Sequence, residues 1–140
     1  MIERYDLNTD ALPTLPTPHD CIVTRMQQED QFIVFYFEND ISGRDSIKAI
    51  HPQAKTLIIR YHLTKYREFT FHKWYRGIRL LFPSGFYKQI DKPNLDKLVL
   101  PRLEYLYHHV SYCSIITTLF SDGYMILDAN VDYVEFEWIE

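Results

Sequence analysis

Hydrophobic residues along this chain recur mostly with a period of two, which is typical of strands that bury one face. The exception is Gln31–Phe37, in which six apolar or aromatic residues follow one another. This run is too short for a membrane span and has the length of one strand. Because it is rich in β-branched and aromatic side chains, we expect a strand that is covered on both faces and lies at the centre of the core.

Alternating apolar positions predict strands on both sides of this run. Ile22–Met26 precedes it as the other arm of a hairpin, and Leu57–Leu63 and Phe69–His72 follow it as a second hairpin with a turn at residues 65–67. Ile78–Phe82 predicts one more strand of the same meander. The last third of the chain predicts three consecutive antiparallel strands: 113–120, 124–127 and 134–140, with a type I′ turn at Asp122-Gly123 and a second turn at 128–130.

Helix is expected in one short stretch, Leu95–Leu100, where Asn94 can serve as N-cap and Pro101 ends the helix. Residues 1–18 contain three of the seven prolines, which predicts an extended arm laid across the body or a mobile leader. Residues 19–140 are then a single β-rich domain. The predicted fold is mainly β, an antiparallel β-sandwich or a strongly curved sheet with at most one or two short helices.

Composition supports a folded domain and makes the charge pattern informative. Of the 140 residues, 46% are hydrophobic and 16% aromatic, which argues against disorder. The net charge of −4 gives no global attraction to nucleic acid or to an anionic membrane. Locally, residues 55–92 hold nine Lys and Arg against two acids, whereas residues 120–140 hold six acids and no Lys or Arg. We therefore expect basic middle strands to lie beside acidic terminal strands.

Cysteine usage and the chain's beginning indicate the compartment. Cys21 and Cys113 are far apart and do not resemble a disulfide framework. The acidic start of the chain lacks the apolar stretch of a signal peptide, and no window of the sequence approaches 18 apolar residues. The expectation is a cytoplasmic protein without a membrane span.

No pattern of residues predicts catalysis or metal binding. His62 and His72, which would meet across the second hairpin, are the single beginning of a metal site, and no Cys/His pair has structural zinc spacing. The run His19-Asp20-Cys21 suggests a nucleophile, but adjacent side chains on a strand point to opposite faces. Cys113, in a predicted core strand, is expected to be a buried apolar residue. We expect no catalytic residue, metal or cofactor, and a non-enzymatic protein.

Two groups of residues are candidates for binding another protein. Tyr, Trp and Arg supply much of the binding energy at protein interfaces, and acidic residues can steer a basic partner. The candidates are Arg60, Arg67, His72, Trp74, Tyr75 and Arg76 in the basic middle and Glu135 and Glu137 in the acidic end. The alternative is a small-molecule or single-stranded nucleic-acid binder that uses the basic aromatic strands. The acidic net charge makes nucleic acid the less favoured partner, and an exposed edge strand would also permit a homodimer.

Both ends of the predicted domain carry a resemblance. Pro18-His19-Asp20-Cys21-Ile22 leads into a strand, a polar turn and the aromatic strand 32–37, and the chain ends on alternating acidic and large apolar residues over 132–138. This arrangement resembles a group of small bacterial β-rich domains of poorly defined function, some of which are similar to immunity proteins of toxin systems. The resemblance implies a cytoplasmic bacterial protein that binds a partner protein and is not an enzyme.

Overall fold

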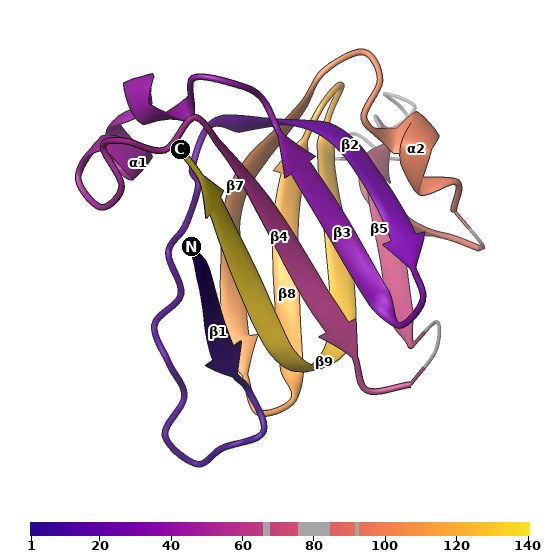
Figure 1. Cartoon of the computed structure of the whole chain (residues 1–140). Helices are drawn as coiled ribbons and strands as arrows, with labels where there is room; N and C mark the ends of the chain where they lie inside the picture. Colours follow the sequence, from indigo (N-terminus) through magenta and orange to yellow (C-terminus); the bar gives the residue numbers. More distant parts are fainter. Residues whose placement is uncertain (66–67, 76–84, 92) are drawn as a thin grey trace.

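The computed structural model describes residues 1–65, 68–75, 85–91 and 93–140. In these ranges one antiparallel sheet of nine strands accounts for most of the chain, together with two short helices and one 3-10 turn (Figure 1). The strands are β1 Ile2–Asp6, β2 Cys21–Glu29, β3 Phe32–Phe37, β4 Thr56–Leu63, β5 Phe69–Tyr75, β6 Phe86–Ile90, β7 Leu103–Ser111, β8 Ser114–Phe120 and β9 Tyr124–Ile139. The helical elements are η1 Ile41–Gly43, α1 Asp45–Lys48 and α2 Leu95–Leu98. The predicted mainly β fold is confirmed, and of the two predicted architectures the single curved sheet is present.

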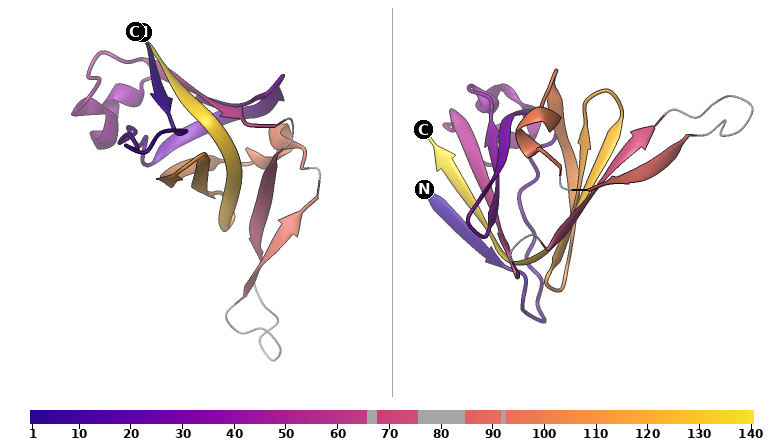
Figure 2. Two further views of the ribbon diagram at one scale, coloured as in Figure 1. Left: turned by 90° about the horizontal axis from the view of Figure 1, so that it is seen from below. Right: turned by 90° about the vertical axis from the view of Figure 1, so that its right-hand side faces the viewer.

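Strand β9 closes this sheet on itself. The hydrogen-bonded order runs β4-β3-β2-β7-β8-β9, and β9 pairs again with β4, so the strands form a closed ring. The first half of β9 lies between β8 and β5, and its second half lies between β4 and β1. In Figure 1, β3 and β4 are in front of β7 and β8, and β9 passes from the rear layer to the front. β5 and β6 extend the sheet outward from the ring as a projecting hairpin (Figure 2).

The turn predicted at residues 128–130 is wrong, because β9 continues through it for 16 residues. Polar side chains at Asp128 and Asn130 suggested a chain reversal, but both are exposed on the sheet's outer side while Ala129 between them is buried. The backbone here pairs on both sides, with Phe69 and Ile115 both opposite Ala129. Alternation therefore persists through the polar residues, and the last third contains two strands where three were predicted.

The predicted hairpin of Leu57–Leu63 with Phe69–His72 is also wrong. These segments are β4 and β5, and each pairs with β9 instead of with the other. His62 consequently lies opposite Tyr133 and His72 opposite Ile126, so the two histidines do not form a shared site. Local alternation identified both strands but carries no information about which strand lies between them.

Two predictions about turns need correction. The reversal after β8 exists, but three residues separate Phe120 from Tyr124 and Gly123 is the one with positive φ, whereas a type I′ turn has two central residues with positive φ. Cys113 lies in the preceding β7–β8 turn with φ of 51°, half-buried, and is not a residue of the core strand. The turn after β8 is therefore one residue longer than predicted, and β8 begins one residue later than predicted, at Ser114.

The core fills the inside of the closed ring. Ile33, Val34 and Phe35 of β3 are fully buried, which places this strand in the core as predicted, but Phe32 and Tyr36 on the side of Val34 are partly exposed, so the outer face is covered only in part. A polar cluster is embedded among these side chains: the Tyr61 hydroxyl is 2.8 Å from the Tyr105 hydroxyl and 2.8 Å from that of Thr117. Burial raises the pKa of both tyrosines, so their hydroxyls remain neutral and satisfy one another.

The N-terminal segment begins as a strand of the sheet. β1 pairs with β9, and the two chain ends lie side by side (Figure 2). Residues 7–20 then lead from β1 to β2, and Leu7 and Leu15 of this segment are buried in the core. At its end, the Asp20 amide donates a hydrogen bond to the Tyr105 carbonyl oxygen at 2.9 Å. The predicted helix is present as α2, with Asn94 at its N-cap position but without a side-chain capping bond.

Candidate functional site

The acidic residues predicted to bind a partner are matched by basic residues of the neighbouring strands. Arg60 Nη2 lies 2.7 Å from Glu137 Oε2, and both side chains are about three-quarters buried. Glu135 stands between Arg4 of β1 and Arg60 of β4 in the strand register. The expected juxtaposition of basic middle and acidic terminal strands is confirmed here. An internal ion pair therefore accounts for Arg60 and Glu137, and Glu135 lies beside two arginines in the strand register.

Three of the remaining predicted residues, His72, Trp74 and Tyr75, lie on β5 of the projecting hairpin. His72 and Trp74 lie on one side of β5 and Tyr75 on the other, as alternation requires. The Trp74 ring contacts Tyr87 of β6 edge to face, with ring centroids 5.0 Å apart. Tyr75 stacks on Phe86 at 5.9 Å. Arg67, Arg76 and the strand predicted at Ile78–Phe82 lie outside the described residues.

Trp74 belongs to a larger group of aromatic side chains that the sheet brings together. We define the tyrosine face as Trp74 of β5, Tyr87 of β6, Tyr107 of β7, Phe120 of β8 and Tyr124 of β9. Tyr87, Tyr107 and Tyr124 are each between 43% and 47% exposed. Five strands therefore contribute rings to one outer surface of the sheet, and this surface is the strongest candidate functional site.

The tyrosine face is hollowed. A cleft of about 280 Å³ is lined by His19, Tyr87, Leu106, Tyr107, Thr118, Tyr124 and Ile126. A second hollow of about 600 Å³ continues beside Trp74, Phe120 and Tyr124. Partial burial raises the pKa of Tyr87, and the nearby hydroxyls of Tyr107 and Tyr124 contribute in the same direction. The three phenols are thus close neighbours on the tyrosine face, and each hydroxyl can both donate and accept a hydrogen bond.

Sheet geometry and one glycine position these rings. Phe120 and Tyr124 are direct cross-strand partners, and their ring centroids are 5.2 Å apart. Gly85, with φ of 77°, lies against the Trp74 indole, and a Cβ at this position would clash with that ring. The backbone at Gly85, just before β6, therefore packs directly against the Trp74 indole and helps to hold it in place. The rings are held in place by the sheet, a property that lowers the entropic cost of binding.

The other chemical hypotheses find less support in the geometry. Cys21 is fully buried, and burial raises the pKa of its thiol to about 11, which is the opposite of what a reactive cysteine needs. His19 instead places Nδ1 2.6 Å from the Leu106 carbonyl oxygen. Among the described residues, no group of three or more His, Cys, Asp and Glu could hold a metal ion. The described helices are all too short to cross a membrane.

Sequence reasoning identified Trp74 and missed Tyr87, Tyr107 and Tyr124. Each of the three sits at an outward position of a strand, so alternation marks it as exposed, but an exposed tyrosine by itself is common. Their assembly on neighbouring strands depends on the ring topology. Comparisons of the chain with protein-family models, with curated proteins and with solved structures find no match.

Proposed function

We propose that this chain is a non-enzymatic binding module that recognises a partner protein through the tyrosine face. The observation that carries this proposal is the gathering of one Trp, three Tyr and one Phe on a single outer surface. Tyrosine and tryptophan are enriched at binding hot spots because they combine a large apolar area with a polar tip.

The chemistry of the face defines the expected partner. Apart from Lys73 and Asp122 at one end and His19 at the other, the residues that line the two hollows are uncharged. A complementary partner surface is therefore largely uncharged at its centre, with apolar side chains that insert between the rings and carbonyl oxygens that accept from the phenols.

An immunity-type role in the bacterial cytoplasm is the biological form of this proposal, and it comes from the resemblance of the chain's two ends. An alternative contact surface for this role is the pair Glu135 and Glu137, whose charges would attract a basic partner. The ion pair of Glu137 with Arg60 favours the tyrosine face over this acidic strand as the contact surface.

The test is co-purification followed by titration of the captured protein. The wild type is compared with Tyr87→Ser/Tyr124→Ser and with Glu135→Lys/Glu137→Lys. We expect one partner to be retained by the wild type and by the lysine variant and lost by the serine variant. In calorimetric titration with the purified partner, the serine variant should bind at least about tenfold more weakly.

A matched control separates the tyrosine face from tyrosine content. Tyr112 is 63% exposed in the turn between β7 and β8 and lines neither hollow, so Tyr112→Ser should bind the partner like the wild type. Equal weakening by Tyr112→Ser, or unchanged binding by Tyr87→Ser/Tyr124→Ser, would refute the tyrosine face as the interface.

The second candidate function is binding of single-stranded nucleic acid. Lys73 and Lys88 are cross-strand partners on the projecting hairpin, where Trp74 and Tyr87 offer rings for base stacking. The two lysines lie on the side of the hairpin opposite the two rings, which ranks this function second. Fluorescence anisotropy with a labelled oligothymidine at two salt concentrations tests it, since phosphate contacts produce a steep loss of affinity with salt.

A further inference from the structure

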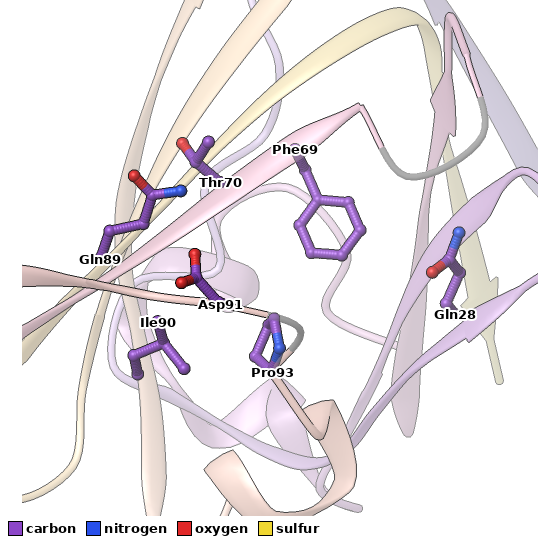
Figure 3. Close-up of a pocket in the computed structure, with 7 residues that line it drawn as sticks. All are labelled: Gln28, Phe69, Thr70, Gln89, Ile90, Asp91 and Pro93. Atoms are coloured by element: carbon purple, nitrogen blue, oxygen red, sulfur yellow. The ribbon is translucent and has the colours of Figure 1, made fainter.

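A separate pocket of about 240 Å³ opens where the base of the β5–β6 hairpin approaches β2 (Figure 3). It is lined by Gln28, Phe69, Thr70, Gln89, Ile90, Asp91 and Pro93. None of these side chains belongs to the tyrosine face. β7 pairs with β2 only over Cys21–Val23, so the far end of β2 is paired with β3 on one edge and, among the described residues, with no strand on the other, which leaves room for the pocket.

The pocket combines one apolar wall with polar groups at its margins. Figure 3 shows the Phe69 ring across from Pro93, with Gln28 on one side and Thr70, Gln89 and Asp91 on the other. Gln28 Nε2 has no hydrogen-bond partner among the described residues, but it is buried from solvent. The polar groups that a ligand in the pocket meets are therefore Thr70, Gln89 and Asp91.

These groups restrict the chemistry of a ligand. Among the described residues that line the pocket, Asp91 is the one that carries a charge, so an anionic ligand is repelled. An entirely apolar ligand would desolvate a carboxylate and an amide without replacing their hydrogen bonds. A simple cation would pair with Asp91 but offers no acceptor to the Gln89 amide and no apolar face to Phe69. The ligand must be neutral, must both donate and accept hydrogen bonds, and must have an apolar face for Phe69.

We propose that this pocket binds a neutral sugar ring. Sugar hydroxyls both donate and accept, so they can bond the Asp91 carboxylate and the Gln89 amide together, while the ring's C–H groups pack on Phe69. An adjoining hollow of about 360 Å³ shares Gln28, Phe69 and Pro93 and adds Asn94 and Asp96. This second space accommodates a substituent or a second sugar unit on the bound ring.

Saturation-transfer NMR on the full chain tests the proposal. D-Glucose, D-galactose, D-mannose and N-acetyl-D-glucosamine are each titrated to about 20 mM, above the Kd expected of a weak ligand of one ring. At least one sugar should give a saturable signal. Asp91→Ala should weaken its binding about tenfold or more, because a charge-assisted hydrogen bond is lost.

Further variants separate this site from a fold defect and from the tyrosine face. Asp91 and Gln89 are both exposed, so Asp91→Ala and Gln89→Ala should retain the wild-type circular dichroism spectrum and still bind the sugar more weakly. Tyr124→Ser should bind the sugar like the wild type. The proposal is overturned if none of the four sugars saturates, if both pocket variants bind like the wild type, or if adenine alone, a neutral planar ligand without a sugar, saturates the site.

Discussion

The two halves of β9 both turn apolar side chains toward the core, but their outward side chains differ in chemistry. Inward, Leu127 in the first half and Phe136 in the second are both buried in the core. Outward, the second half carries Glu135 and Glu137 against arginines of β1 and β4, whereas the first half carries Tyr124 at 47% exposure. Internal charge pairing has used the second half's outer surface, and the first half's outer surface has rings available for a partner.

Inner positions of the two halves should be about equally costly to truncate. Phe136→Ala is expected to lower the free energy of unfolding by about 3–5 kcal/mol and Leu127→Ala by about 2–5 kcal/mol, because each leaves a cavity in a closed core. Denaturant titration measures both. A cost of less than about 1 kcal/mol for Leu127→Ala would mean that the first half of β9 is loosely packed, and would contradict the claim that both halves pack equally against the core.

The buried polar cluster of Tyr61, Tyr105 and Thr117 should make the protein sensitive to acid. The Tyr105 hydroxyl lies 2.6 Å from His108 Nδ1, and burial lowers the pKa of this histidine from 6.5 to about 4. As the pH falls below 6.5, the unfolded chain binds a proton that the folded chain does not bind. Stability contributed by neutral His108 is therefore lost between pH 6.5 and 4, by about 2 kcal/mol at pH 5.

Urea titrations at pH 7 and pH 5 measure this effect against two variants. His108→Asn keeps an acceptor for the Tyr105 hydroxyl and removes the titration, so its stability should fall less between the two pH values than that of the wild type. His109→Asn, at the neighbouring exposed position, should retain most of the wild-type pH dependence, because the charge of His109 is the smallest cause of the lowered His108 pKa. The same loss in His108→Asn as in the wild type would assign the acid sensitivity to the carboxylates.

Two tyrosines on β9 offer a matched test of the outer surfaces. Tyr133 in the second half stacks on His62 with centroids 4.6 Å apart, and the Arg4 guanidinium lies 3.6 Å from its ring centroid. Tyr133→Ser should cost about 1–2 kcal/mol of stability, whereas Tyr124→Ser should stay within about 0.5 kcal/mol. Thermal unfolding measures both. Equal costs would mean that Tyr124 is also a structural contact and would weaken its assignment to binding.

The sequence pattern predicted single strands well because alternation is a local property. β4 is an example, since Leu57, Ile59, Tyr61 and Leu63 are all fully buried as their spacing required. The pattern failed at Asp128 and Asn130, because two outward polar residues in a strand look like a turn in the sequence. Only the pairing with β5 and β8 shows that the strand continues through them. Long-range pairing decides these positions, and a single sequence does not encode it in any short window.

The candidate site was predictable only in part for the same reason. Trp74 stood out because it lies among basic residues in sequence. Tyr87 and Tyr124 did not stand out, because they line one cleft but are 37 positions apart in the sequence. The charge asymmetry was a better guide: it predicted that basic and acidic segments would meet, and Arg60 with Glu137 is where they do.

That ion pair gives the sharpest test of the claim that the second half is neutralised internally. A double-mutant cycle of Arg60→Ala and Glu137→Ala should show a coupling of about 0.5–1 kcal/mol, because the atoms are 2.7 Å apart and both side chains are mostly buried. The coupling should shrink in about 1 M NaCl, where screening is strong. Arg4 and Asp6, paired at 3.0 Å but more than half exposed, should show no measurable coupling. A vanishing coupling for Arg60 and Glu137 would return the acidic strand to the candidate surfaces, since Glu137 would then be free to attract a basic partner.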